Sequence, residues 1–383
     1  MLHICTVSQL HTIHPRAFHV APQLKSVKLS CNNLSTLSAR VFSPLTSLEQ
    51  LSLDENQLKT IAPDMFEGLV SLQQLDLSRN NLSSPVSNIF DGLTNLTFLH
   101  LGRNSIKKFP STIFHGLTNL RHLILYNNEL EMLEAGMFDD LVNLVELKMN
   151  YNKITSLPPQ VFWSLRNLEQ LTLSSNKLQA IPERSFYNMP KLITLTISNN
   201  PLLSLPYQLM GHMPDMIELY LYYTNLTTVP GSLFANMSGL QRLNLHFNNK
   251  LRELPSDLFC CVPKLVKLSL KSNDLHYLHP QLFSSLTTLD ILLLNDNKLQ
   301  NLPDNTSFSY CSNNHTARNN IGHHSTSSPT RHHPNNHFNY NTLCRTYNEP
   351  TDHSSISHHH SAWRGVSSHQ RDSFVSFHVT YFL

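Results

Sequence analysis

Three carboxylates near the start of the chain come nearest, by type and spacing, to an acid–base catalyst. Asp54 and Glu55 are adjacent, and Asp76 follows at a similar place in the next segment. Two carboxylates can act as general acid and base when a pocket brings them together with a matched partner. Here they fall on an open face, and no base accompanies them in the pattern. We therefore expect a protein that is not an enzyme, with no cofactor and no small-molecule substrate.

Histidine is the second residue type that could do chemistry, because its ring nitrogens bind metal ions. His358, His359 and His360 form a run that would attract Ni²⁺ or Zn²⁺. The run falls within 304–383, which is rich in Asn, His and Ser and has no periodic pattern. This composition predicts a disordered low-complexity tail. We expect that it is not part of the native protein sequence. We expect no physiological metal site there.

The six cysteines show no metal-ligand spacing. Cys260 and Cys261 are adjacent and follow Phe259, which occupies a core position of the pattern described below. We expect one of these two thiols to be buried and the other exposed.

The rest of the chain is a repeat of 24 residues with the pattern LxxLxLxxNxLxxLPxxxFxxLxx. Eleven complete units of 24 or 25 residues span 24–288, with a partial unit at each end. Alternation in LxxLxL predicts a short strand whose leucines point inward. One unit cannot bury its apolar face alone, so the units must stack and share a core.

Two columns of residues fix the register of the units. The first is aromatic: Phe18, Phe42, Phe66, Phe90, Phe114, Phe138, Phe162, Phe186, Phe234, Phe259 and Phe283, interrupted by Met210. The second is asparagine: Asn32, Asn56, Asn80, Asn104, Asn128, Asn152, Asn176, Asn200, Asn248, Asn273 and Asn297. A buried Asn amide can pair the backbone groups of its own turn and of the neighbouring turn. Both columns are therefore interpreted as structural.

Two units depart from the pattern. Pro85 takes an inward position of the third unit, so we expect a local irregularity there. The segment LHFNNKL, which runs from Leu245 to Leu251, contains one extra residue and makes its unit 25 residues long.

The repeat resembles that of the extracellular leucine-rich repeat family, over about four fifths of the chain. The resemblance implies an α/β-type repeat solenoid over 1–303, in the form of a leucine-rich repeat horseshoe. Its concave face would be a parallel β-sheet and its convex side irregular. Members of the family carry a Cys-rich cap at each end and a secretory leader, and neither motif is present here. We therefore expect an incomplete gene product.

A group of aromatic residues stands out on the outward positions of the predicted strands. The segment LYLYYTNL, residues 219–226, has Thr224 in place of the expected Asn, and the preceding outward positions are small and polar. Large aromatic side chains exposed on a rigid sheet are typical of interface hot spots. Alternatively, they merely cover one another as cross-strand pairs. We predict a protein-binding patch on the concave face, made of Tyr220, Tyr222, Tyr223, His246 and Phe247.

Residues 219–259 resemble the glycoprotein V branch of the family, in Thr224, in the LxxxPxxxFxNxSxLxxL run and in the extra residue before Leu251. The repeat units also resemble those of the carboxypeptidase N regulatory subunit. The first resemblance implies a subunit of a cell-surface adhesion complex in haemostasis, and the second a secreted carrier that stabilises a carboxypeptidase. Either implies an extracellular or cell-surface location, with the signal peptide and any membrane anchor missing from this chain.

The remaining expectations concern partners and modification. The net charge is +2 and no basic stripe is present, so we expect no nucleic-acid partner. No apolar run approaches the length of a membrane span. Among the N-x-S/T sequons we expect glycans at Asn95, Asn225 and Asn236.

Overall fold

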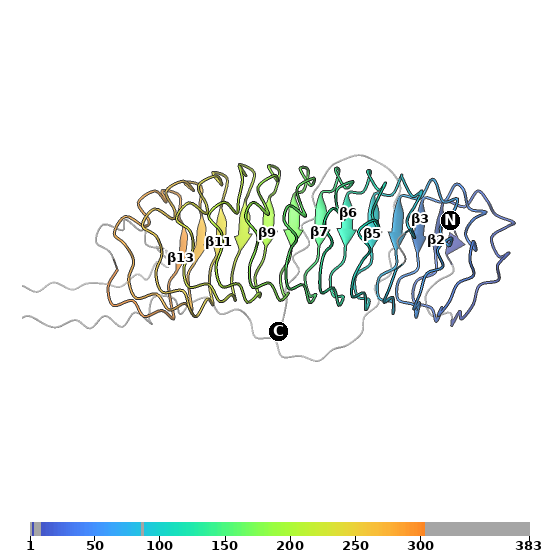
Figure 1. Cartoon of the computed structure of the whole chain (residues 1–383), viewed down its shortest axis with the longest axis horizontal. Helices are drawn as coiled ribbons and strands as arrows, with labels where there is room; N and C mark the ends of the chain where they lie inside the picture. The colour runs from blue at the N-terminus through green and yellow to red at the C-terminus, as the bar shows by residue number, and fades with distance from the viewer. Residues whose placement is uncertain (1, 4–8, 86–87, 303–383) are drawn as a thin grey trace, which may run out of the picture. The chain divides into compact units, whose positions relative to one another are not determined.

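The computed structural model describes residues 2–3, 9–85 and 88–302 (Figure 1). Within these ranges the chain forms one 13-stranded parallel sheet, in which the order of the strands follows the sequence. The strands are β1 (Leu2–His3), β2 (Ser26–Lys28), β3 (Gln50–Ser52), β4 (Gln74–Asp76), β5 (Phe98–His100), β6 (His122–Ile124), β7 (Glu146–Lys148), β8 (Gln170–Thr172), β9 (Thr194–Thr196), β10 (Glu218–Tyr220), β11 (Arg242–Asn244), β12 (Lys267–Ser269) and β13 (Ile291–Leu293). The tail predicted over 304–383, with its histidine run, lies outside the described residues.

The register of the sheet matches the repeat. Each residue of β9 pairs with the residue 24 positions later in β10, as Leu195 does with Leu219. Between β11 and β12 the step is 25, because Leu243 pairs with Leu268. The extra residue after Asn248 is therefore accommodated in the turn, and the strand leucines stay in line. The predicted 25-residue unit is confirmed.

The core is a stack of leucines behind the sheet and a stack of phenylalanines behind the leucines. The leucines of the LxL segments from β3 to β12 are buried, as are the phenylalanines of the aromatic column. Met210 fills the gap in that column and is also buried. From Phe114 to Phe186 the rings stack with centroids 6.0–6.1 Å apart. The structural interpretation of this column is confirmed.

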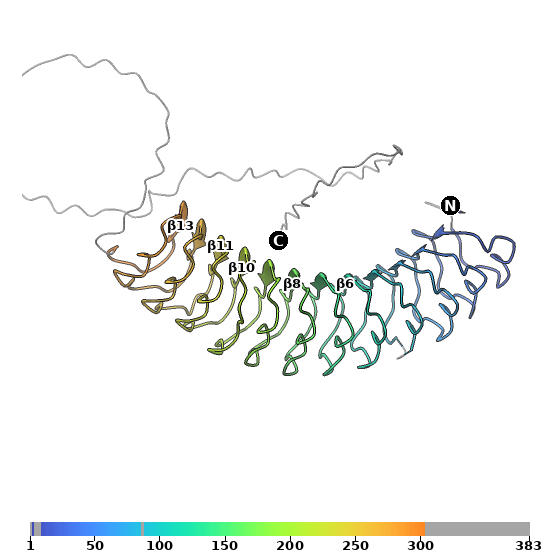
Figure 2. The same ribbon diagram turned by 90° about the horizontal axis from the view of Figure 1, so that it is seen from above.

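The strands and the phenylalanine rings repeat at different spacings, and this difference curves the stack of repeats. Neighbouring strands lie about 4.8 Å apart, whereas the phenylalanine rings repeat at about 6 Å. The strand side is therefore the shorter side. Figure 2 shows the stacked repeats as an arc with the strands on its inner side. The opposite side is built from turns, and the described residues contain no helix. This confirms the horseshoe with a concave parallel sheet and an irregular convex side.

The asparagine column pairs the backbone where the chain leaves each strand. Asn56 shows the repeating arrangement: its Nδ2 donates to the carbonyl oxygens of Leu29, at 2.9 Å, and Leu53, at 3.1 Å. Its Oδ1 accepts the N–H of Leu34 at 3.1 Å. One side chain thus pairs backbone groups in its own turn and in the preceding turn. Buried backbone groups are costly when unpaired, so this column fixes the stacking of the turns.

Candidate functional site

The residue before each column asparagine, and before Thr224 in the same column, has a left-handed backbone. Its φ lies between +53° and +57° in twelve successive turns. The residues are Cys31, Glu55, Arg79, Arg103, Asn127, Tyr151, Ser175, Asn199, Tyr223, Phe247, Ser272 and Asp296. Asparagine and glycine adopt this conformation readily, but a bulky residue does so at a cost of about 1 kcal/mol. The scaffold therefore imposes strain wherever an aromatic residue takes this place.

Two strained aromatic residues occur side by side, at Tyr223 and Phe247. Their rings stack with centroids 4.6 Å apart and an angle of 9° between the planes. Half of the surface of Tyr223 remains exposed. Next to them, the rings of Tyr222 and His246 stack at 4.5 Å and 7°. Two pairs of stacked rings therefore join the turns after β10 and β11.

Tyr220 is the predicted patch residue most involved in the sheet itself. Its hydroxyl donates to Glu218 Oε2 at 2.8 Å, and Glu218 also forms an ion pair with Arg242. Burial, the hydrogen bond to Glu218 and the charge of Glu218 raise the pKa of Tyr220. Tyr220 is therefore a half-buried, protonated residue at the edge of the patch. It meets the ring of Tyr222 edge-on, with centroids 6.4 Å apart.

His246 is the uncharged member of the patch. Burial, followed by the charges of Lys271 and Lys267, lowers its pKa to about 4. The ring is therefore neutral at physiological pH. Its Nδ1 is buried and has no hydrogen-bond partner within the described part of the chain. The four rings of Tyr222, Tyr223, His246 and Phe247 thus form a neutral, largely apolar surface, which we call the aromatic patch.

The turn that holds Tyr223 has a changed hydrogen-bond pattern. Thr224 Oγ1 donates to Asn248 Oδ1 at 2.8 Å, and the Thr224 N–H binds the same oxygen. An asparagine at 224 would also accept the N–H of Leu202, as Asn200 accepts that of Leu178. Among the described residues the Leu202 N–H has no partner. The turn is therefore less completely bonded than its neighbours.

A second aromatic cluster lies on β5 and β6, and the sequence reasoning missed it. Phe98 and His122 have ring centroids 6.2 Å apart, and His100 and Tyr126 5.8 Å apart. Gly102 makes room for the second pair, because a Cβ there would lie 3.0 Å from His100 Nε2. The sequence did contain a signal for this cluster. Phe98 and His100 take outward positions, and a glycine follows them in the GRN sequence at 102–104.

His100 also corrects one expectation. The acidic group was predicted to have no base beside it, but His100 Nδ1 lies 3.4 Å from Asp76 Oδ2. Burial would raise the pKa of Asp76, yet the hydrogen bond and charge of His100 hold it below its usual range. The pair lies on the open sheet face, and no serine or cysteine among the described residues hydrogen-bonds to His100. The arrangement therefore resembles a cross-strand pair more than a catalytic triad.

The three predicted glycosylation sites differ in their surroundings. Asn95 is exposed, but its Nδ2 donates to the carbonyl oxygen of Val70 at 2.8 Å. Asn225 is half-buried, and Asn236 is exposed. Nδ2 is the atom that would carry the glycan. Asn236 is exposed and, among the described residues, its Nδ2 makes no hydrogen bond. Modification of all three stays a prediction.

The expectation for the paired cysteines is wrong. Cys260 and Cys261 are both exposed, and a disulfide joins them to each other. Both follow Phe259 into the turns on the convex side, and of these three residues Phe259 alone is buried. The sequence pattern could assign Phe259 to the interior, but it could not show that the next two side chains both point outward.

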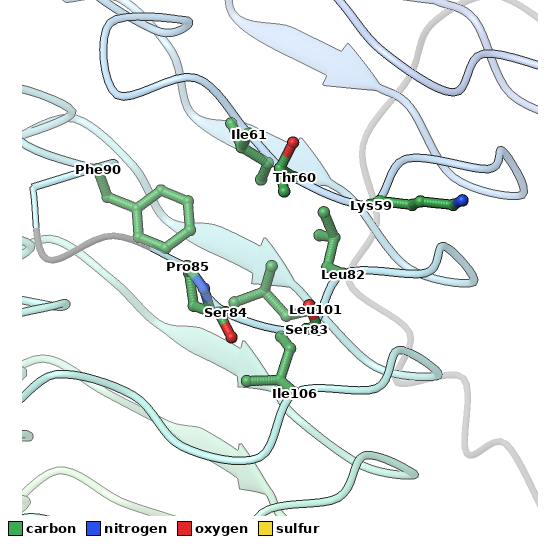
Figure 3. A pocket seen from close by; sticks show the side chains of 10 residues that line it. All are labelled: Lys59, Thr60, Ile61, Leu82, Ser83, Ser84, Pro85, Phe90, Leu101 and Ile106. Atoms are coloured by element: carbon green, nitrogen blue, oxygen red, sulfur yellow. The ribbon is translucent and has the colours of Figure 1, made fainter.

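A small cavity and an open groove are present among the described residues. The cavity, of about 10 Å³, lies where Pro85 occupies an inward position, and Leu82, Phe90 and Ile106 line it (Figure 3). It has room for about one water molecule and agrees with the irregularity expected at Pro85. The groove, of about 440 Å³, is wide open and runs past Ile193 and Ile217. Within the described ranges no three His, Cys, Asp or Glu residues are placed to hold a metal ion, and no helix could cross a membrane.

Comparison with protein families identifies the solenoid. The model of the leucine-rich repeat matches residues 1–58, 22–82, 47–106, 94–154, 118–178, 143–202, 166–222 and 214–275. The chain belongs to the leucine-rich repeat family. No curated protein sequence is a significant match. The family and fold are those of protein-interaction scaffolds, and they indicate no catalytic relative.

Solved leucine-rich repeat structures superpose on most of the chain. The Drosophila Toll chain of a Toll–Spatzle complex is 26% identical, with a TM-score of 0.67 over 76% of this chain and 39% of that one. A leucine-rich repeat protein of Leptospira interrogans is 27% identical, with a TM-score of 0.62 over 74% and 69%. TLR13, in a complex with ssRNA13, is 28% identical, with a TM-score of 0.60 over 76% and 46%. The chain thus spans about two fifths of the Toll chain.

Proposed function

We propose that this leucine-rich repeat chain is an extracellular protein-binding scaffold and that the aromatic patch is its main contact site. The observation that carries the proposal is the pair of stacked rings at Tyr223 and Phe247, both held in a left-handed backbone. Strained residues persist where the surrounding structure enforces them, and they gather at functional sites. Exposed tyrosines on a rigid surface are also frequent in interface hot spots.

The neighbouring turn shows that the fold does not need these rings. After β9, the same two places hold Ser198 and Asn199, with the same backbone conformation at Asn199. Small polar residues are therefore sufficient to build the turn. Because aromatic residues add strain without being required, a role in recognition accounts for them better than a role in folding.

The proposal can be tested without knowing the natural partner. We would select binders to the whole chain from a library of random peptides displayed on phage. The double variant Tyr222→Ser/Tyr223→Asn copies the preceding turn and should fold. If the patch is the contact site, most selected peptides should lose affinity by about thirtyfold or more on this variant, corresponding to about 2 kcal/mol.

A matched control removes an aromatic residue elsewhere on the same face. Tyr151 has the same left-handed backbone after β7 and is 44% exposed. The variant Asn150→Ser/Tyr151→Asn should leave peptide affinity unchanged. Selected peptides that bind the Tyr222→Ser/Tyr223→Asn variant as tightly as the parent chain would refute the proposed site.

Two finer proposals concern the kind of scaffold. Thr224 and the extra residue before Leu251 support a subunit of a cell-surface adhesion complex in haemostasis, similar to glycoprotein V. The alternative is a secreted subunit that stabilises a carboxypeptidase. To separate them, the chain would be incubated with a secreted metallocarboxypeptidase at 37 °C. A longer half-life of the enzyme would favour the carrier, and adhesion of platelets to the immobilised chain would favour the adhesion subunit.

A further inference from the structure

Two lysines without carboxylate partners border the aromatic patch. Lys267 on β12 forms no ion pair with any described residue. Lys271, two residues beyond the same strand, places its Nζ 5.5 Å from the ring centroid of Phe247. Both lysines are half-buried. The edge of the patch towards β12 thus carries two positive charges.

The charges that could neutralise these amines have other partners. Glu218, at the opposite edge, accepts the Tyr220 hydroxyl and forms an ion pair with Arg242. Asp274 is paired with Arg252 and Lys298. Asp296, in the turn after β13, accepts a hydrogen bond from Ser272 Oγ at 3.2 Å. The charges of Arg242 and Glu218 cancel each other. The charges of Lys267 and Lys271 remain, so the surroundings of the patch on β10 to β12 are positive.

The pKa of His246 reflects the positive charge of the two lysines. The charges of Lys271 and Lys267 act with burial to lower its pKa. Both amines are therefore close enough to affect a ring inside the patch. The opposite situation holds at β3 and β4, where burial and the charge of Asp76 raise the pKa of Asp54. The concave face is thus negative near its start and positive beside the aromatic patch.

We propose that the partner segment which binds the aromatic patch is an acidic peptide stretch, with side-chain carboxylates that meet Lys267 and Lys271. This inference rests on the function proposed above and adds the chemistry of the partner. An apolar or aromatic side chain of the segment would lie on the rings, while its carboxylates pair with the two amines. Complementary charge of this kind raises association rates and selects among partners.

A nucleic acid fits the same charges less well. Proteins that bind nucleic acids neutralise several phosphates, commonly along a basic stripe. Here two amines are unpaired, and the acidic residues near β3 and β4 lie on the same face. A peptide needs only one or two carboxylates at the right place, so the charge distribution favours the peptide.

The selection experiment also tests this inference, by the composition of the peptides. We expect the peptides that lose affinity on Tyr222→Ser/Tyr223→Asn to be enriched in Asp and Glu over Lys and Arg. For a synthetic version of the most enriched peptide, Lys267→Gln/Lys271→Gln should weaken binding by roughly three- to tenfold in 50 mM salt and by less in 500 mM salt. The control Lys148→Gln, on β7, should leave the affinity unchanged.

The outcomes separate the two proposals. Peptides that require the aromatic patch but show no acidic enrichment would overturn the acidic partner and leave the proposed site standing. Peptides that are indifferent to the tyrosine variant would overturn both. Tight, lysine-dependent binding of a single-stranded RNA oligonucleotide, with no acidic peptides selected, would also overturn the acidic-peptide inference.

Discussion

The turns that follow β9 and β10 are neighbours on one sheet and yet carry different residues, Ser198, Asn199 and Asn200 in one and Tyr222, Tyr223 and Thr224 in the other. Their backbones agree, because φ is +54° at Asn199 and +53° at Tyr223. The Asn200 side chain pairs four backbone groups, whereas Thr224 leaves the Leu202 N–H without a partner among the described residues. The comparison shows that stacking fixes the path of the chain, while the outward residues can change. A turn can thus lose a backbone hydrogen bond and carry exposed aromatic rings while keeping its path.

The largest effect is expected where the structural turn is broken. In Asn200→Ala, the buried Leu178 N–H and the Ile197 carbonyl oxygen lose their side-chain partner. Each unpaired buried group costs about 1–3 kcal/mol, so the free energy of unfolding should fall by roughly 3 kcal/mol. Urea denaturation measures the change, with Gln170→Ala, at an exposed strand position, as the control. A loss no greater than that of the control would show that the column is not what holds the turns in place.

The reverse change should repair the other turn. Thr224→Asn restores an acceptor for the Leu202 N–H and should stabilise the protein by about 1 kcal/mol. It leaves the sequon of Asn225 intact, since Thr227 is unchanged. The same denaturation experiment applies, with Thr228→Asn, at an exposed place, as the control. A lower stability of Thr224→Asn would mean that the threonine contact with Asn248 outweighs the missing bond.

Replacing the strained ring should change stability little. Tyr223→Asn removes the stacking on Phe247, worth about 0.5–1.5 kcal/mol, and relieves a left-handed backbone strain of similar size. The two effects oppose each other, so the unfolding free energy should move by less than about 1 kcal/mol. Tyr151→Asn relieves the same strain outside the patch and serves as the comparison. A loss above about 2 kcal/mol for Tyr223→Asn alone would show that the rings serve the fold.

The smallest expected effect is on pH dependence. The pKa of His246 is lowered to about 4 in the folded protein, below its ordinary value of about 6.5. The unfolded chain therefore binds the proton first, so stability that is present above pH 6.5 declines as the pH falls towards 4. His246→Ser/Phe247→Asn should lose less stability than the parent chain between pH 7 and pH 5, measured by the urea midpoint. Equal losses would mean that His246 does not contribute to the pH dependence.

Much of the scaffold could be predicted because the same residue types recur every 24 residues. The leucine, phenylalanine and asparagine columns give the strands, the core and the 25-residue unit, since each depends on residue type and spacing alone. Strand alternation also predicted an outward direction for Tyr220 and Tyr222. The left-handed backbone before each position of the asparagine column could not be predicted, because residues of many types occupy that place. The sequence reasoning also missed the pairing of His100 with Asp76, which depends on side-chain rotamers across two strands.

The bond between Cys260 and Cys261 has a mechanical consequence. Within the described residues it is the sole disulfide, and it closes no loop between one turn and another. Each strand contacts only the strands before and after it in sequence. Under tension, turns could therefore peel away from an end one by one, each releasing 24 residues, or roughly 80 Å of chain. The solenoid would lengthen in equal steps under load, as a tether does, and recoil as the turns dock again.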